Sequence, residues 1–311
     1  MTILKFQMKK ILIFLIGCSL FQSCDDGDII ITTFNFEDAE LKSCGQLGNF
    51  VFYKINPDAQ ESLSLKLGIS DSLYNEEGTK PYTLDGTNNF VNYRTYNGEL
   101  DASYFCSSVP PTAPIVTVDY LAASGTAEFT TTYIYDDNDG VPAEDELDGD
   151  TDGDGIPNMY DEDDDGDNVP TALELDILNL DGDNNPLTNA LDTDNDGTPD
   201  YLDVDDDGDE VFTRYEDANM DLNPRNDVSD PNVGANYLNN DVADTYLVNE
   251  YYLHEYTITK DVKIVLKDLV LISGEEEIIQ ESLTMGTILN VEEIEKSIKP
   301  SFPSETKSNK E

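Results

Sequence analysis

The sequence contains no Trp, one His and only four Cys among its 311 residues, and 17 Lys and Arg stand against 66 Asp and Glu. The shortage of basic side chains excludes nucleic acid as a partner, because binding to phosphates depends on Lys and Arg that displace counterions. It also excludes attachment to anionic lipid through a polybasic patch. A hydrophobic fraction of 38% is low for one globular body of this length. We therefore expect a smaller folded core and a long polar segment.

The sequence also lacks the residue constellations of common enzymes. His254 is the single histidine and lies in an expected strand, where we predict a packing role. No Gly-rich phosphate loop follows an expected strand, and the Ser-His-Asp and Cys-His arrangements of hydrolases lack a credible base in this sequence. Pairs of carboxylates can hydrolyse glycosides, but among so many acids no single pair is informative. The sequence predicts that the protein is not an enzyme.

The negative charge is concentrated in residues 136–230. This segment holds 29 Asp and six Glu against two Arg, a net charge of −33 out of −49 for the chain. A plain acidic run of this size would be disordered, because its charges repel and it buries little apolar surface. The acids here are regularly spaced, which argues against a plain run.

Short runs of β-branched and aromatic residues flank the acidic segment. Before it, they occupy residues 29–34, 50–53, 62–67, 90–96, 116–120 and 127–135, and after it, residues 251–259, 262–272 and 277–289. About three strands alone make a poor core. We therefore predict one antiparallel β-sandwich in which the last strands pair with the first ones; two separate small β domains are the alternative. The expected parts are 24–135 and 246–290 for the sandwich, 136–245 for the insert and 291–311 for a flexible tail.

The acids of the insert recur at alternate positions of twelve-residue loops. In the first loop, Asp150, Asp152, Asp154 and Asp161 stand at positions 1, 3, 5 and 12, and Gly155 at position 6 allows a sharp turn. Alternate carboxylates, a carbonyl at position 7 and an acid at position 12 can converge on one hard cation such as Ca²⁺. Without Cys or His nearby, zinc and copper are poor candidates.

Three loop types repeat along the insert, the first two after 42 residues and the third after 38. The predicted ligands of the first type are Asp150, Asp152, Asp154, Ile156 and Asp161, then Asp192, Asp194, Asp196, Thr198 and Asp203. Those of the second type are Asp163, Asp165, Asp167, Val169 and Glu174, then Asp205, Asp207, Asp209, Val211 and Glu216. Those of the third type are Asp181, Asp183, Asn185 and Asp192, then Asn219, Asp221, Asn223 and Asp230.

Some loops depart from the pattern. Asn168 and Glu210 replace the glycine at position 6 of the second type, and Asn tolerates a left-handed backbone better than Glu does. The Asp205 loop is therefore the more doubtful site, and the third type should bind more weakly because Asn replaces acids. Upstream, a degenerate copy of the second type is formed by Asp137, Asp139, Gly140, Val141 and Glu146.

The motif Asp-x-Asp-x-Asp-Gly-Ile/Thr-Pro, at residues 150–157 and 192–199, resembles the thrombospondin type 3 repeats. The resemblance covers residues 136–230. It implies an irregular, calcium-stabilised insert with little regular secondary structure that wraps about four to six calcium ions. The eukaryotic repeats also carry cysteine bridges, which this insert lacks, so bound ions would supply nearly all of its cross-links.

The N-terminus predicts export. Lys9 and Lys10 precede a short apolar run, as in a secretory signal, and residues 1–23 resemble the signal peptide of a bacterial lipoprotein. The resemblance implies a lipid at Cys24, with Cys18 as the alternative. The acids that follow Cys24 resemble a tag for the outer face, which implies a lipid anchor in the bacterial outer membrane at the cell surface.

The remaining cysteines, Cys44 and Cys106, form an even pair in an oxidising compartment. We predict a disulfide between them, which would stabilise the fold by about 3–4 kcal/mol. Together, these features predict a calcium-binding, lipid-anchored surface protein that acts as a structural or adhesion module and binds an unknown extracellular protein or glycan. The alternative is a glycan- or nutrient-binding surface lipoprotein in which the calcium array is a stiff spacer.

Overall fold

A computed structural model describes residues 36–302, except 71, 72, 110, 147, 148, 177, 180 and 181. The predicted signal segment, Cys18, Cys24 and the strand expected at 29–34 lie outside the described residues. The chain divides into two compact units. The first unit combines the chain up to Thr130 with Lys263–Ile288, and the second combines Thr131–Val262 with the chain from Leu289 onward.

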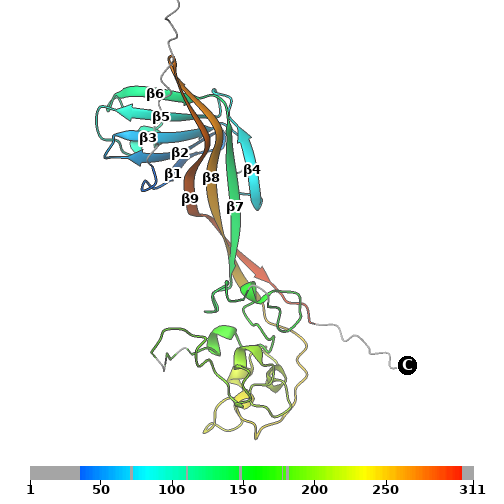
Figure 1. The fold of residues 1–311 in the computed structure, drawn as a ribbon. Coiled ribbons are helices and arrows are strands. Elements are labelled where there is room, and N and C mark those ends of the chain that lie inside the picture. Colours follow the sequence, from blue (N-terminus) through cyan, green and yellow to red (C-terminus); the bar gives the residue numbers. More distant parts are fainter. Residues whose placement is uncertain are drawn as a thin grey trace, which may run out of the picture. The chain divides into compact units, whose positions relative to one another are not determined.

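The regular structure is mainly β. The strands are β1 (Lys42–Gln46), β2 (Asn49–Asn56), β3 (Glu61–Leu67), β4 (Gly78–Thr83), β5 (Phe90–Tyr96), β6 (Val116–Ala122), β7 (Thr126–Asp136), β8 (His254–Ser273) and β9 (Glu276–Ile298). They form one nine-stranded sheet in the order β1-β2-β3-β5-β6-β8-β7-β4, with β9 paired to β8 (Figure 1). The prediction of a mainly β fold is confirmed.

Strands from both sides of the acidic segment share this sheet. β6 pairs with β8 in antiparallel register, with Leu121 opposite Ile272 and Ala122 opposite Leu271. Before this junction, β1, β2, β3, β5 and β6 form an antiparallel ladder. The last strands therefore complete a sheet that the first strands begin, as in the interrupted arrangement expected from the sequence.

The sheet of the first unit curls so that its two halves face each other. Phe52 on β2 meets Phe129 on β7 with ring centroids 5.1 Å apart, although four strands separate β2 from β7 in the sheet order. The alternation in β3 directs Leu63, Leu65 and Leu67 into the same interior, where all three are fully buried. This apolar interior supplies the hydrophobic stabilisation of the first unit.

The predicted disulfide is confirmed. Cys44 on β1 is bonded to Cys106, with a Cα–Cα distance of 5.7 Å, and the bridge fastens helix α2 (Ser103–Cys106) to the sheet. Phe105 of α2 also stacks on Tyr53 of β2, with ring centroids 4.4 Å apart. The bridge closes a 62-residue stretch of the chain and so constrains its unfolded state.

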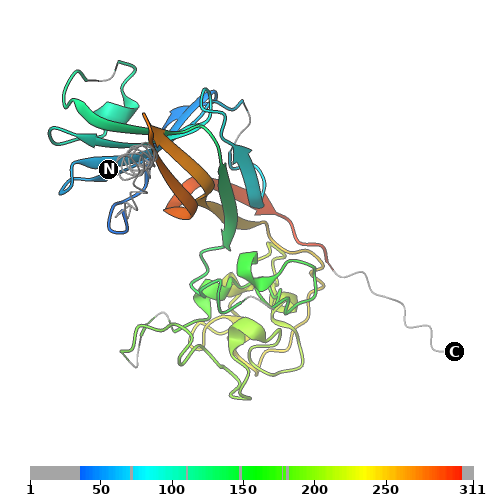
Figure 2. The ribbon, with the colours of Figure 1, turned by 45° about the horizontal axis from the view of Figure 1, so that its top comes forward.

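The segment between β7 and β8 contains only short 3₁₀ turns among its described residues (Figure 2). They are η1 (Asn158–Tyr160), η2 (Thr171–Leu173), η3 (Asp200–Leu202), η4 (Thr213–Glu216), η5 (Pro224–Asn226) and η6 (Asn236–Leu238). Four of them, η1, η2, η3 and η5, have proline at or next to their first residue, where its fixed φ fits but longer regular structure does not follow. The expected lack of regular secondary structure in the insert is thus observed.

Residues 291–298 differ from the flexible tail expected there, because β9 continues through Ile298. Two contacts hold this part of β9 to β8: Lys260 Nζ lies 2.7 Å from Glu292 Oε2, and Asn290 N donates to Asp261 Oδ1 at 2.9 Å. Polar contacts between β9 and β8 thus accompany the extra length of β9, and a hydropathy pattern does not predict such contacts. No helix among the described residues is long and apolar enough to cross a membrane.

Candidate metal centres

The acidic loops curl through hydrogen bonds from backbone to carboxylate. The aspartate at position 5 accepts the N–H of the residue two positions later, as in Asp154 to Ile156 at 2.7 Å and Asp167 to Val169 at 2.6 Å. Position 6 is left-handed in the loops of the first and second types, with φ of +97° at Gly155, +75° at Asn168 and +75° at Glu210. Glu210 adopts this conformation despite its side chain, and its N–H donates to Asp205 Oδ2 at 3.1 Å.

The second-type loop at residues 163–174 forms the most enclosed cluster. Asp163, Asp165 and Asp167 are at most 1% exposed, and each has a carboxylate oxygen within 4.8 Å of those of the other two. The backbone N–H groups of Asp167 and Asn168 bind the Asp163 oxygens. Asp165 and Asp167 each retain one buried oxygen that has no partner among the described residues.

Glu174, at position 12, completes this cluster. Its side chain is 2% exposed, and neither carboxylate oxygen has a hydrogen-bond partner in the described part of the chain. Burial, together with Asp167 and Asp165, raises the pKa of Glu174 well above its usual range. Burial likewise raises the pKa of Asp167 to about 8. The buried acids must therefore bind protons or a cation, because isolated buried charges are costly.

The second-type loop at 205–216 repeats this arrangement in a more open form. Glu216 is 1% exposed, and both of its oxygens lack partners within the described residues. Burial raises its pKa to about 9, and the negative charges of Asp207, Asp209 and Asp205 add to the shift. The charges that raise the pKa of Glu216 thus come from the three Asp residues that the sequence predicted for this loop.

The degenerate upstream copy also forms a buried cluster. Asp137, Asp139 and Glu146 have carboxylate oxygens within 4.8 Å of one another, and each side chain is at most 7% exposed. Burial and Asp139 raise the pKa of Glu146 to about 8. A buried oxygen of each residue has no partner in the described structure. This copy therefore has the same chemistry as the two full loops.

The first-type loops also bring their acids together, but nearer to solvent. Asp150, Asp152 and Asp154 form one cluster, and Asp192, Asp194 and Asp196 form another. Asp161 is 1% exposed and accepts the N–H of Asp163 at 3.2 Å, so it links the first-type loop to the next one. Asp203 accepts the N–H of Asp205 at 3.1 Å in the same way.

The third-type loops are more exposed than the second-type loops among their described residues. Asp181 lies outside the described residues, and Asp183 and Asn185 are exposed. In the second copy, Asp217 opens the loop rather than Asn219, because its two oxygens accept the N–H groups of Asp221 and Leu222. The expected register was therefore displaced by two residues: Asp217 is fully buried and Asp221 is exposed.

Asp230 belongs to a third copy of the first loop type. Ser229 N donates to Asn236 Oδ1 at 2.7 Å, as Thr193 N does to Asp200 Oδ1 and Thr151 N to Asn158 Oδ1. Asp230 then accepts the N–H of Asn232, so it takes the place of Asp152 and Asp194. The 36-residue offset from the previous copy hides this equivalence in the sequence.

Asp164 and Asp206 are among the buried carboxylates that the sequence reasoning missed. Asp164 and Asp206 are each 2% exposed and stand at position 2 of the second-type loops, 42 residues apart. Their shared spacing was the available signal. A search for acids at positions 1, 3 and 5 of each loop overlooks these two residues, because the side chain at position 2 points away from the centre of its own loop.

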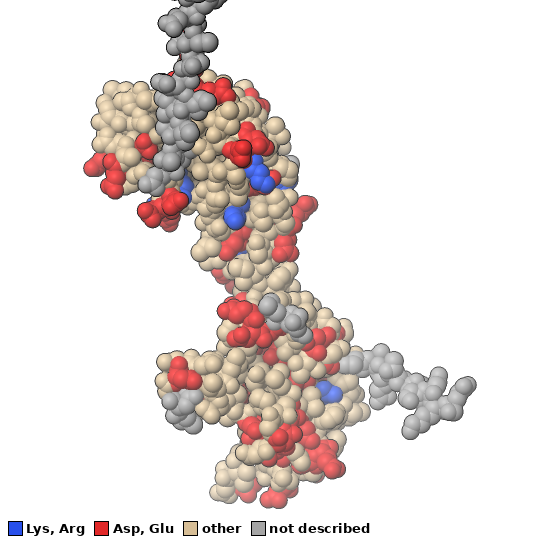
Figure 3. All heavy atoms as spheres, in the orientation of Figure 1, with Lys and Arg blue, Asp and Glu red and all other residues tan. Residues whose placement is uncertain are grey.

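The whole set of oxygen ligands indicates sites for hard cations. No family model, curated protein or solved structure matches the chain. The resemblance to thrombospondin type 3 repeats therefore remains a prediction. Figure 3 shows Asp and Glu scattered over the visible face of the acidic segment, with uncharged surface between them, in accord with the burial of many of its carboxylates.

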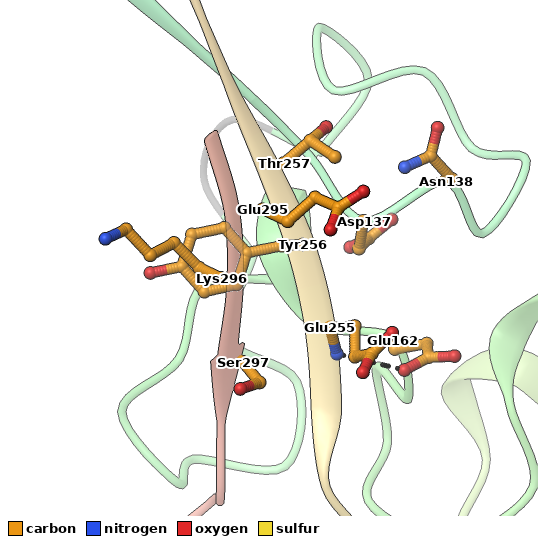
Figure 4. A pocket seen from close by; sticks show the side chains of 9 residues that line it. All are labelled: Asp137, Asn138, Glu162, Glu255, Tyr256, Thr257, Glu295, Lys296 and Ser297. Atoms are coloured by element: carbon orange, nitrogen blue, oxygen red, sulfur yellow. Dashed lines mark hydrogen bonds between the residues drawn. The ribbon is translucent and has the colours of Figure 1, made fainter. Parts of the chain in front are cut away.

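A polar pocket of about 640 Å³ lies in the second unit, next to the upstream cluster (Figure 4). Its lining includes Asp137, Glu162, Glu255, Tyr256 and Glu295. Glu255 N donates to Glu162 Oε2 at 3.1 Å, the contact dashed in the figure. Because Asp137 belongs to both the pocket and the upstream cluster, a cation at that cluster would change the charge of the pocket wall.

Proposed function

We propose that the acidic segment binds several Ca²⁺ ions, which hold it in its folded form. The observation that carries this proposal is the buried Glu174, whose two oxygens have no partner in the described chain, beside Asp163, Asp165 and Asp167. Without a cation, these acids must take up protons to avoid mutual repulsion. A divalent ion would neutralise two charges and supply the missing contacts.

The ligand set favours Ca²⁺ among the common cations. Asp, Glu and backbone carbonyl groups offer only oxygen, which suits hard ions. Mg²⁺ demands a strict octahedron and retains water, whereas Ca²⁺ accepts six to eight oxygens in irregular geometry. The carboxylate at position 12, aimed into the cluster, fits a bidentate ligand of the larger ion.

The free energy of ion binding would stabilise the folded form of the acidic segment. Apart from its 3₁₀ turns, the segment has no regular structure among the described residues, and its net charge of −33 would expand it without cations. Extracellular calcium modules work at dissociation constants on the order of 10⁻⁴ to 10⁻³ M. We therefore assign the ions a structural role in an exported protein rather than a signalling one.

An extracellular location is supported by the Cys44–Cys106 disulfide, because such bridges persist in oxidising compartments. With the signal-like N-terminus, it supports a lipid-anchored surface protein that acts as a structural or adhesion module. Mass spectrometry of the mature N-terminus tests the anchor: a lipid on Cys24 supports it, and an unmodified cleaved N-terminus contradicts it.

The calcium proposal is tested by titrating the purified, metal-free protein with Ca²⁺ and with Mg²⁺. We expect several bound Ca²⁺ ions by isothermal calorimetry, a smaller radius of gyration by X-ray scattering, and weaker binding of Mg²⁺. Glu174→Gln should lose one Ca²⁺ site. Glu210→Gln removes the same charge from an exposed side chain and should keep all sites. An unchanged radius at millimolar Ca²⁺ contradicts the proposal.

The pocket favours a second candidate function, the binding of a glycan. Tyr256 lines the pocket, and its ring packs at a tilt against Tyr160, which in turn packs at a tilt against Tyr135, at centroid distances of 5.3 and 5.2 Å. Aromatic rings beside carboxylates can bind sugar rings and hydroxyl groups. A glycan array probed with the wild type and with Tyr256→Ala tests this function; equal binding by both proteins contradicts it.

A further inference from the structure

The side chain of Asp206 does not serve the loop to which it belongs by sequence. Asp206 follows Asp205, which opens the loop at 205–216, yet its carboxylate lies within 4.8 Å of those of Asp167 and Glu174 in the preceding second-type loop. It is 2% exposed, and neither of its oxygens has a hydrogen-bond partner among the described residues. A buried carboxylate without a partner, beside the carboxylates of Asp167 and Glu174, indicates a shared ligand.

The backbone around Asp206 fixes this direction. Asp206 N donates to the hydroxyl of the fully buried Thr213 at 3.2 Å, and Thr213 N donates to Val204 O at 2.9 Å. These bonds join the start of the 205–216 loop to its turn η4. With its backbone held on that side, Asp206 presents its carboxylate to the neighbouring loop.

The same arrangement occurs 42 residues earlier at Asp164. Asp164 N donates to the buried hydroxyl of Thr171 at 3.0 Å, the side chain is 2% exposed, and Oδ1 has no partner in the described chain. The backbone of Asp164 is therefore held to its loop in the same way as the backbone of Asp206.

We propose that Asp206 is a ligand of the cation site at 163–174. The ion at this site then joins two successive second-type loops, because the loop that follows supplies one of its ligands. This inference rests on the proposed calcium binding and adds a direction to it: the sites of the two second-type loops are built in overlapping order along the chain. Occupation of one site then orders the start of the next loop.

This order has a consequence for the last full loop. The acids that act on Glu216 are Asp207, Asp209 and Asp205, all from its own loop. The site at 205–216 therefore has three Asp and one Glu, whereas the site at 163–174 has a fifth carboxylate from Asp206. Since affinity in such sites increases with the number of charged ligands, the 163–174 site should bind Ca²⁺ more tightly.

The inference is tested by Ca²⁺ calorimetry on the full chain with Asp206→Asn in double-mutant cycles. We expect Asp206→Asn to weaken one site on the order of tenfold, consistent with loss of a charged ligand. Combined with Glu174→Gln, its effect should be strongly non-additive, because both residues bind the same ion. Combined with Glu216→Gln, the effects should add.

A charge-matched control separates ligation from general electrostatics. Glu210→Gln removes one negative charge four residues from Asp206, at an exposed side chain, and should change the affinity of the 163–174 site by less than Asp206→Asn does. If Asp206→Asn leaves every site unchanged, or couples to Glu216→Gln instead of Glu174→Gln, the inference is wrong while calcium binding stands. If the wild type binds no Ca²⁺, the proposed function itself fails.

Discussion

Asp161 and His254 form a buried contact that joins an acidic loop to strand β8. Asp161 Oδ1 lies 2.6 Å from His254 Nδ1, and both residues are 1% exposed. A packing role was expected for the single histidine, and burial agrees with it, but the residue packs against a carboxylate of the acidic segment. The contact joins β8 to the second unit's acidic loops at the point where the loop at 150–161 ends and the loop at 163–174 begins.

Replacing His254 should therefore destabilise the array. We expect His254→Leu to lower the free energy of unfolding by about 1–3 kcal/mol, because it leaves a buried carboxylate without its polar neighbour. Thermal unfolding in saturating Ca²⁺ measures this change. The adjacent Leu253→Ala, at a side chain that is 53% exposed, is the control and should have little effect. Equal midpoints for both variants contradict the structural role.

The glycines of the second-type loops should differ from those of the first type. Gly208 has φ of +67°, and a Cβ built there would lie 2.7 Å from Asp194 Oδ2. Gly153 has a similar φ of +73°, but nothing lies within 4 Å of its Cβ position. Gly153→Ala should therefore lower the free energy of unfolding by only about 1 kcal/mol, because a side chain is unfavourable on a left-handed backbone. Gly208→Ala must also displace Asp194.

Calcium titration separates these two variants. We expect Gly208→Ala to weaken binding at the loop that contains Asp194, because the carboxylate moves, whereas Gly153→Ala should mainly lower the thermal midpoint. If both alanines weaken binding equally, the close approach of the two loops is not important for the site.

The metal-free protein should lose stability as the pH rises. Burial raises the pKa of Glu146 to about 8 and of Glu216 to about 9. A carboxyl with a raised pKa binds more protons in the folded state than in the unfolded one, so its folded form loses stability between the unfolded pKa, near 4.5, and the raised value. Thermal unfolding in a chelator from pH 5 to 9 should show a falling midpoint.

Ca²⁺ should reverse this trend, because the ion must displace the protons that the buried carboxyls hold. The midpoint in excess Ca²⁺ should therefore rise from pH 5 to 7. Calorimetric titrations at pH 7 in buffers of different ionisation enthalpy should reveal proton release. Identical heats in all buffers would show that these carboxyls are ionised before the metal binds.

The disulfide should stabilise the sheet independently of calcium. Removing Cys44–Cys106, by Cys44→Ser with Cys106→Ser, should lower the free energy of unfolding by about 3–4 kcal/mol through the freed chain entropy. The number of bound Ca²⁺ ions should remain unchanged, because both cysteines belong to the first unit and the clusters belong to the second. Calorimetry and chemical unfolding measure the two quantities, and a lost Ca²⁺ site would contradict their independence.

The repeating sequence was a reliable guide to local geometry. Alternate acids at 163–167 and 205–209, with a left-handed residue after them, curl each loop through bonds between neighbours in the chain, so their clustering could be predicted without a structure. In the third loop type, Asn219 and Asn223 resemble ligands by spacing, whereas the backbone N–H groups of Asp221 and Leu222 donate to Asp217, which the spacing did not indicate.

The sequence by itself determined most of the segments that form strands, which cysteines pair and where carboxylates gather around loop centres, but it missed β1 and β4 and divided β8 into two runs. These features follow from side-chain alternation, cysteine number and contacts over a few residues. Only the tertiary structure decided that β8 joins β6, that Asp161 meets His254, and that Asp206 lies beside Asp167 and Glu174 of the preceding loop. Such contacts depend on the paths of distant backbone segments, which the local spacing of residues does not encode.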